Sequence, residues 1–398
     1  MVVKVIFNNA LHVGLCSSLS WFLALGVLVG CEGAPGPVAL SEDATNAPMR
    51  GLTDDEAVVF NRGDTEIEDV IRDTGGLGPL YIEASCRSCH GKDSRGPGKV
   101  DRMAIANPDG TEATGASGML PYGTVVRRHL AAGATHPVLP PEGASGLVLS
   151  TRFGPALFAR GRIDSVAEQT ILDEEARQAV SGRVSGRANR LADGAIGRFG
   201  VKARVATLDI FVADAFHGDM GLTSVRFPAE VPNPDGLTDD LKSGLDVDEA
   251  TISDIAFYIR TLALPKRVGL SERGSEVLAQ TGCLECHVNS YQTRKDTSVK
   301  ALSGIAMDMY SDLLLHDMGT TGADGITDFQ ASGREWKTAP LVGLRFFKSY
   351  LHDGRAKTLE DAILEHAGEG SEANFAVELY KSLPADDRQL LLDHLGRL

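Results

Sequence analysis

The sequence predicts a mainly α-helical fold built from two similar halves. Apolar residues recur at helical spacing over residues 248–264, where Ile252, Ile255 and Ile259 would share one face. Strand signals are few, and Pro265 marks a natural boundary because proline ends a helix. With 398 residues, 43% of them hydrophobic, the chain is long enough for two domains with their own cores.

The expected helices follow the chain in order. Residues 64–74 contain the pattern Glu-Ile-Glu-Asp-Val-Ile of an amphipathic helix, and residues 155–179 carry apolar residues near helical spacing. The helix at 248–264 stops before Pro265. Further helices are expected at 271–281, 358–365 and 385–398.

Two Cys-x-x-Cys-His runs carry the clearest chemical signal. Chance predicts only about 0.002 such runs in a chain with 6 Cys and 10 His. The pattern is the attachment signature of a c-type haem, in which two thiols bind the haem vinyl groups and the histidine binds iron. A zinc site is disfavoured because no spare cysteine remains to complete it. The runs are Cys86-Arg87-Ser88-Cys89-His90 and Cys283-Leu284-Glu285-Cys286-His287, called the first and second run below.

Each run sits between an expected helix and a closing helix, which is the layout of a small cytochrome c domain. We therefore expect two cytochrome c-like haem domains, at residues 51–265 and 266–398, each with one covalently bound haem. The runs begin 197 residues apart, from Cys86 to Cys283, so the first domain must carry long loop insertions.

The first thirty residues predict an export signal. Lys4 precedes an apolar stretch at 13–29, which contains Cys16 and is short for a membrane span. The stretch closes with Leu-Val-Gly-Cys31, which resembles a bacterial lipobox and implies lipidation of Cys31. We expect a lipid-anchored, periplasm-facing protein with a flexible tether at 31–50. Glu32, where an aspartate commonly signals inner-membrane retention, favours the outer membrane.

The net charge of −15 argues against nucleic acid as a partner, because phosphates would be repelled. An acidic surface could steer a basic electron-donor cytochrome or small redox protein. It serves plain solubility equally well.

Several further segments resemble the di-haem oxidoreductase family, whose members are also called thiol oxidoreductases. The resemblance covers residues 51–398, and this family is similar to bacterial di-haem cytochrome c peroxidases and MauG enzymes. It implies electron transfer from the C-terminal to the N-terminal haem, and reduction there of a peroxide or similar small oxidant. The alternatives are a non-catalytic electron-transfer cytochrome, linked for example to iron reduction or uptake, and MauG-like oxidation of a partner protein. The segments are 153–158, 197–200, 219–224, 311–319, 327–340 and 351–356.

The resemblance also suggests iron ligands. In the peroxidases the far ligand of the second haem lies fourteen residues after the His of a His-x-Gly motif, which here is His352, so the ligand would be His366. Met318 and a solvent-exposed role for His366 remain alternatives. At the first haem Ala106 occupies the place of a labile distal histidine. His129 or His136 could reach back to that iron, or its sixth position is open.

Other roles follow from the same resemblance. Glu168 is the first candidate for moving protons and Glu174 the second, with surface carboxylates as the alternative. Arg355 is a candidate partner for a haem propionate, and Arg198 a weaker one. Ala159 and Arg160 stand near the place of the inter-haem tryptophan, for which Trp336 could substitute, although a core role is commoner. Related peroxidases hold an interdomain Ca²⁺, but no acidic EF-hand-like loop marks one here.

Overall fold

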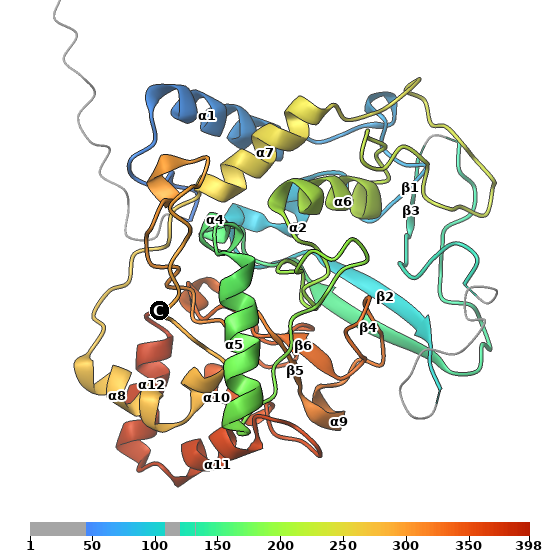
Figure 1. The fold of residues 1–398 in the computed structure, drawn as a ribbon. Helices are drawn as coiled ribbons and strands as arrows, with labels where there is room; N and C mark the ends of the chain where they lie inside the picture. The colour runs from blue at the N-terminus through green and yellow to red at the C-terminus, as the bar shows by residue number, and fades with distance from the viewer. Residues whose placement is uncertain (1–44, 108–119, 132) are drawn as a thin grey trace, which may run out of the picture. The chain divides into compact units, whose positions relative to one another are not determined.

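Helices form most of the regular structure in residues 45–107, 120–131 and 133–398, which the computed structural model describes (Figure 1). The predicted mainly helical class is therefore confirmed, while the division into two haem domains stays a prediction. The helices are α1 (Asp54–Glu68), α2 (Cys86–Cys89), α4 (Arg160–Asp164), α5 (Glu168–Ser181), α6 (Leu208–Met220), α7 (Glu249–Thr261), α8 (Glu272–Gln280), α9 (Gly319–Gly322), α10 (Leu359–Leu364), α11 (Asn374–Ser382) and α12 (Ala385–Leu395).

The expected signal peptide, the lipidated Cys31 and most of the tether lie outside the described residues. Within the described part of the chain, no helix is both long and apolar enough to cross a bilayer.

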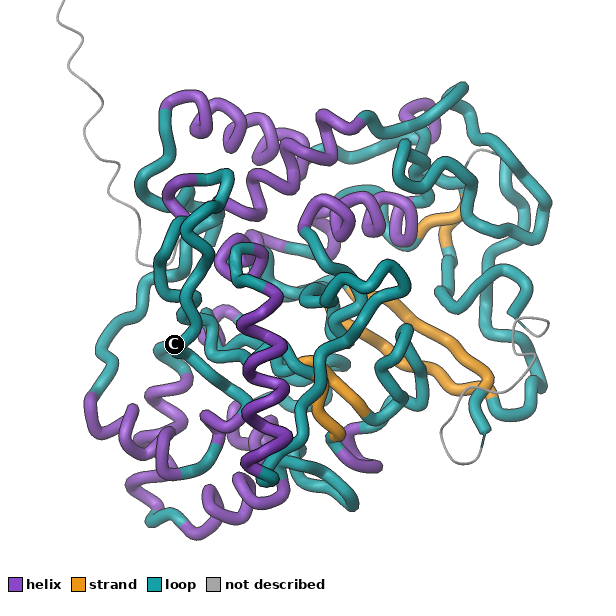
Figure 2. Tube along the Cα trace, viewed as in Figure 1, coloured by secondary structure: helices purple, strands orange, loops and turns teal. Residues whose placement is uncertain are grey.

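In the described residues, three short antiparallel ladders lie among long loops (Figure 2). The longest pairs β2 (Lys99–Ile105) with β4 (Leu147–Phe153). It brings the end of β4 to the first run, where Gly154 N donates to Gly98 O at 3.0 Å and Gly98 N to Cys89 O at 3.3 Å. The other ladders pair β1 (Leu80–Tyr81) with β3 (His129–Leu130), and β5 (Leu315–Asp317) with β6 (Glu335–Lys337).

Helix α7 organises the side of the core that holds the first run, since α1, α4 and α6 all pack on it. Gly63 allows α1 to pack closely against α7, because a Cβ at this position would lie 2.3 Å from the carbonyl oxygen of Asp254. Phe60 and Tyr258 pack with ring centroids 4.8 Å apart. Burying a side chain such as Phe60 contributes about 1.5–3 kcal/mol to stability.

Helices α8 and α12 pack together on the side of the second run. Their buried apolar faces include Val277, Leu278, Leu391 and Leu395. Helix α8 ends one turn before the second run, and Gly282 links them with a φ of +73°, a conformation that L side chains rarely adopt. The predicted helix at 271–281 thus positions Cys283 as expected.

Two predicted helices have different bounds in the structure. The helix expected at 64–74 spans Asp54–Glu68 instead, because a Thr53–Glu56 capping box starts it early. The helix expected at 155–179 is split into α4 and α5. The buried guanidinium of Arg198 donates to the carbonyls of Ile163, Asp164 and Val166, which satisfies the free carbonyls at the end of α4.

Candidate di-haem site

The first run positions the imidazole ring of His90 by a hydrogen bond from one of its two ring nitrogens to the backbone. The run forms α2, whose N-cap Ser85 accepts a hydrogen bond from Ser88 N at 3.2 Å. His90 Nδ1 donates to Pro155 O at 2.8 Å, which leaves Nε2 as the nitrogen available to iron. Burial lowers the pKa of His90 to about 4, so the ring is neutral and able to bind a metal. Gly154 makes room, since a Cβ there would lie 3.1 Å from His90 Cε1.

Arg87 fastens the first run to α7. Its guanidinium pairs with the fully buried Asp93 at 2.7 Å, and the hydroxyl of Tyr258 donates to the same carboxylate at 3.0 Å. The middle of the Cys-x-x-Cys-His run is therefore part of the core rather than a free loop.

The second run repeats the histidine geometry. Residues Cys283–Glu285 form a 3₁₀ turn, and His287 Nδ1 donates to Tyr310 O at 3.0 Å. Burial is the main cause that lowers the pKa of His287 to about 4, and His366 lowers it further by its proximity. His90 and His287 thus each present a neutral ring whose Nε2 has no hydrogen-bond partner among the described residues.

The structure places His366 beside the second run, while its role as an iron ligand stays a prediction. His366 follows α10, and its Nδ1 donates to Ala362 O at 2.6 Å. It lines one cavity of about 360 Å³ together with Cys283, Cys286 and His287, called the second-run cavity below. Met318 lines the same cavity, so the alternative ligand stays open.

The walls of the second-run cavity fit a haem. The lining is largely apolar, as expected around a macrocycle, and includes Phe199, Leu341 and Phe347. The cationic residues that line it include Arg160 and the buried Lys337, neither of which has an ion-pair partner among the described residues. Burial and then Arg160 lower the pKa of Lys337 to about 7. Unpaired buried cations suit the propionate carboxylates of a haem.

The two arginines proposed from the sequence as propionate partners also line this cavity. Arg355 remains a candidate, with its Nη1 donating to Thr321 O at 3.0 Å and its Nε 3.4 Å from Asp353. Arg198 is less suited to that role, because its guanidinium already satisfies the backbone carbonyls at the end of α4. The sequence missed Arg160 as a candidate for this role and did not single out Lys337.

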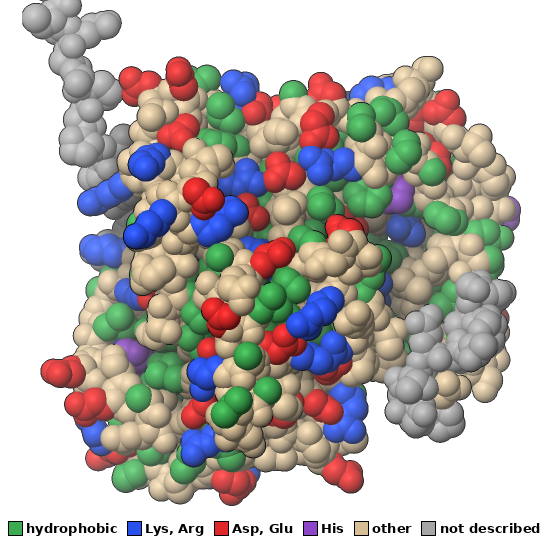
Figure 3. Space-filling view, in the orientation of Figure 1, with side chains coloured by type: hydrophobic (Ala, Val, Ile, Leu, Met, Phe, Trp, Pro, Cys, Tyr) green, Lys and Arg blue, Asp and Glu red, His purple; other side chains and the backbone are tan. Residues whose placement is uncertain are grey.

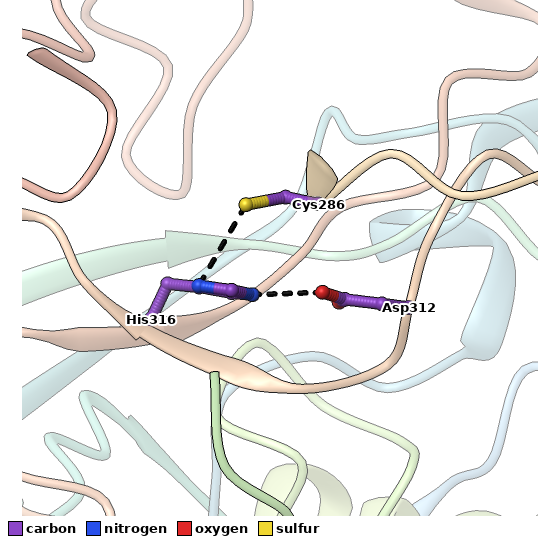
Figure 4. A group of neighbouring side chains, drawn as sticks. All are labelled: Cys286, Asp312 and His316. Carbon is purple, nitrogen blue, oxygen red and sulfur yellow. Dashed lines mark hydrogen bonds and ion pairs between the residues drawn. The ribbon is translucent and has the colours of Figure 1, made fainter. Parts of the chain in front are cut away.

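A charged triad of His316, Asp312 and Glu372 lies beside the second run, and Figure 4 shows His316 between Asp312 and Cys286. His316 Nε2 donates to Asp312 Oδ2 at 2.8 Å, and its Nδ1 donates to Glu372 Oε2 at 2.9 Å and lies 3.7 Å from Cys286 Sγ. Burial alone would lower the pKa of His316, but the hydrogen bonds to its partners raise it well above its usual value. The ring is therefore a charged imidazolium held between two carboxylates.

We expect Asp312→Ala to destabilise the haem-loaded protein by about 3 kcal/mol, because it leaves a buried ion pair incomplete. The measurement is denaturant unfolding, with Glu378→Ala as the control. Glu378 is an exposed carboxylate 2.9 Å from Lys381, and its loss should cost less than about 1 kcal/mol. Equal losses in the two variants would contradict the structural role of the triad.

The triad also predicts the pH dependence of stability. Because the pKa of His316 is raised, its contribution to the free energy of unfolding is complete below pH 6.5, the usual pKa of histidine. That contribution is lost as the pH rises through the pKa of the folded state. Hydrogen bonds from His316 and Ser185 outweigh burial and lower the pKa of Glu372 from 4.5 to about 2. The contribution of Glu372 to the free energy of unfolding is complete above pH 4.5 and is lost as the pH falls towards 2. In the Asp312→Ala variant, the free energy of unfolding should fall less steeply at high pH, because His316 loses a partner that raises its pKa.

The two glutamates proposed for proton transfer do not line the cavity. Glu168 begins α5 with its side chain 50% exposed and accepts from Ile196 N at 3.2 Å. Glu174 is buried, but it lies on the side of the second run, 2.6 Å from Arg177 and 3.1 Å from the Gln178 amide that also contacts Asp312. Their catalytic role stays a prediction without support from these contacts.

The structure instead places Asp219 near the first run. Asp219 lies in the last turn of α6, and its backbone carbonyl accepts from Ile82 N at 2.7 Å, four residues before Cys86. Burial is the main cause that raises the pKa values of Cys86 and Cys89, and the negative charge of Asp219 raises them further. Burial, followed by repulsion from Asp214, raises the pKa of Asp219 to about 6. No described residue hydrogen-bonds its carboxyl group. Asp219 is the first residue of one of the segments that resemble the family, so the sequence did mark this position. The residues that surround Asp219 in the fold could not be predicted from the sequence.

The other histidines proposed for the first iron point elsewhere. His129 is exposed and stacks on Tyr81 with centroids 5.3 Å apart, and His136 is exposed and pairs with Asp235 at 2.7 Å. Trp336 stacks on His352 with centroids 3.8 Å apart, and the buried ammonium of Lys202 lies 4.0 Å from its centroid. A cation against the ring disfavours loss of an electron from Trp336, which supports the core role.

Comparison with known proteins identifies a family. Residues 144–398 match the family described as "Di-haem oxidoreductase, putative peroxidase". No curated protein matches the chain.

Three solved structures show low similarity. Hydrazine synthase from Kuenenia stuttgartiensis is 14% identical with a TM-score of 0.42, over 97% of this chain and 100% of that chain. A MauG-like protein associated with microbial copper homeostasis is 16% identical with a TM-score of 0.32, over 59% and 90%. The diheme peroxidase BthA from Burkholderia thailandensis is 12% identical with a TM-score of 0.38, over 87% and 86%. The family match covers more than half of the chain, which therefore belongs to the di-haem oxidoreductase family.

Proposed function

We propose that this protein is a peroxidase-like oxidoreductase with two c-type haems, in which electrons pass from the second-run haem to the first-run haem and reduce a peroxide or similar small oxidant. The asymmetry of the histidines carries the proposal. His287 and His366 line one cavity at the second run. At the first run, the two histidines that the sequence offered as distal ligands, His129 and His136, are exposed on the surface.

An iron with protein ligands on both sides suits electron storage, and an iron with an open side suits catalysis. When bound, the haems supply electron storage and cleavage of the oxygen–oxygen bond. The chain supplies the positioning: the carbonyls of Pro155 and Tyr310 orient the two proximal rings. Lys337 and Arg160 would hold propionates. Asp219 would accept and return a proton near the first run.

A non-catalytic electron carrier is the second candidate. It is favoured by the placement of Glu168 and Glu174, since neither predicted proton-transfer carboxylate lines the second-run cavity or is seen beside the first run. Such a carrier would have protein ligands on both faces of both irons and would bind no small molecule.

Carbon monoxide binding to the reduced, haem-loaded protein separates the two functions. The mass of the denatured protein should first show two covalently attached haems. We then expect one CO for every two haems, together with peroxide turnover, because one iron is open. Absence of CO binding would mean that both irons are fully ligated, and the peroxidase proposal would give way to the electron carrier.

We further propose that the protein is exported, anchored by lipid at Cys31 to a bacterial membrane and reduced by a cytochrome or small redox protein. The support is the N-terminal sequence and the net charge of −15. On the face shown in Figure 3, acidic and basic side chains are interspersed. A donor that docks on this face would therefore not meet a uniformly acidic patch.

A further inference from the structure

The loop that joins α6 to α7 can be followed in Figure 1. It brings three carboxyl groups together. They belong to Glu230, Asp240 and Asp246, and their possible ligand oxygens all lie within 4.8 Å of one another. The spacing of these residues along the chain matches no EF-hand loop, which is why the sequence did not reveal them. All three lie within residues 51–265, the predicted N-terminal haem domain, whereas the calcium of the related peroxidases lies between domains.

One oxygen of each aspartate is fixed by the protein. Thr223 donates to Asp246 Oδ2 from its N at 2.8 Å and its Oγ1 at 2.6 Å. Lys242 N donates to Asp240 Oδ1 at 2.6 Å. These contacts orient the two carboxylates and leave one oxygen of each without a donor.

The remaining oxygens are buried and unsatisfied. Asp246 is only 8% exposed, and its Oδ1 has no hydrogen-bond partner among the described residues. The same is true of Asp240 Oδ2 and Glu230 Oε2. Gly76 closes one side, because a Cβ there would lie 2.3 Å from Asp246 Oδ1. Water is therefore largely excluded from oxygens that need a positive partner.

No described side-chain cation fills that need. The ammonium of Lys242 donates to the backbone carbonyl of Asp246 and not to any of the three carboxylates. Burial and repulsion by Asp240 and Asp246 raise the pKa of Glu230 to about 8, and burial is also the main cause that raises the pKa of Asp240. The three carboxyl groups therefore favour a bound proton or a metal ion.

We propose that Glu230, Asp240 and Asp246 bind a divalent cation, calcium in preference to magnesium. Donors that are all carboxylate oxygens suit a hard cation rather than zinc or copper. Magnesium sheds water reluctantly, whereas calcium accepts several carboxylates directly, so the dry setting favours calcium. Bound calcium would tie the α6–α7 loop to the turn at Gly76, near the helices that carry Asp219 and Tyr258.

Calorimetry on the chelator-treated, haem-loaded protein tests the proposal. We expect one Ca²⁺ per chain and a rise of the unfolding temperature by about 2–4 °C or more at saturating Ca²⁺. Asp240→Asn, which keeps the size of the side chain, should weaken binding at least tenfold. The control is Glu249→Gln, which removes the same charge from an exposed pair with Arg226 and should leave Ca²⁺ affinity unchanged.

A second readout on the unaltered protein does not depend on a folded variant. If Ca²⁺ displaces protons from the cluster, the binding heat at pH 7 should vary with the ionisation enthalpy of the buffer. Absence of Ca²⁺ binding would overturn the proposal and leave shared protons as the explanation of the cluster. Equal weakening by Asp240→Asn and Glu249→Gln would also overturn it, because binding would then reflect only net charge.

Discussion

The His366→Met variant is expected to raise the reduction potential of the second-run haem by on the order of 0.1 V, a fraction of the ~0.8 V over which axial ligands move haem potentials. A thioether favours ferrous iron more than an imidazole does. His366 and His287 line the same cavity, and each donates its Nδ1 proton to a backbone carbonyl. A methionine placed after α10 would offer sulfur where the imidazole nitrogen now lies.

Spectroelectrochemical titration measures this shift, and the visible spectrum should gain the features of histidine–methionine ligation. Met318→Leu is the matched comparison, because Met318 is the alternative ligand in the same cavity. We expect Met318→Leu to leave the potential unchanged. A change in that variant, with none in His366→Met, would assign the iron to Met318.

Asp219→Asn is expected to lower peroxide turnover by about 100-fold, since general acid–base catalysis contributes roughly 10²–10⁴-fold. The side chain lies near both cysteines of the first run and has no hydrogen-bond partner among the described residues. Burial raises its pKa to about 6, so the proton-accepting carboxylate is present above that pH. Turnover should fall as the pH drops through about 6, and the variant should lose that dependence.

Steady-state peroxide reduction across pH measures this effect, and CO stoichiometry checks that the iron remains accessible. Glu168→Gln and Glu174→Gln serve as comparisons, because the resemblance favoured those residues while the structure places them elsewhere. If Glu174→Gln abolishes turnover and Asp219→Asn does not, the assignment from the family pattern is correct and the one from proximity is wrong.

Short local signals were readable in the sequence. The two attachment runs and α7, with Asp248 at its N-cap and Pro265 beyond its end, depend on residues close together in the chain. His366 was predictable only through a family spacing. Helix α6 was missed because most of its residues are apolar, so that no single face stands out.

The chemistry around the runs depends on contacts between distant segments. Arg160 and Lys337 line one cavity although they lie far apart in the chain. No sequence pattern shows that these two side chains lack an ion-pair partner among the described residues. The ladder of β2 with β4 was also missed, because long-range pairing of strands is set by packing on both sides of the ladder more than by local preference. Glu168 is a motif position whose side chain lies half exposed on the surface, and its catalytic role stays a prediction.

The link between Arg87 and α7 limits how the protein can be divided. Tyr258 follows Arg87 by 171 residues, yet both meet the buried carboxylate of Asp93. A fragment that ends before α7 would expose Asp93 and release the middle of the first run. The smallest piece that keeps the first attachment site intact must therefore extend to Thr261, and this half of the protein can complete its fold only after α7 has been made.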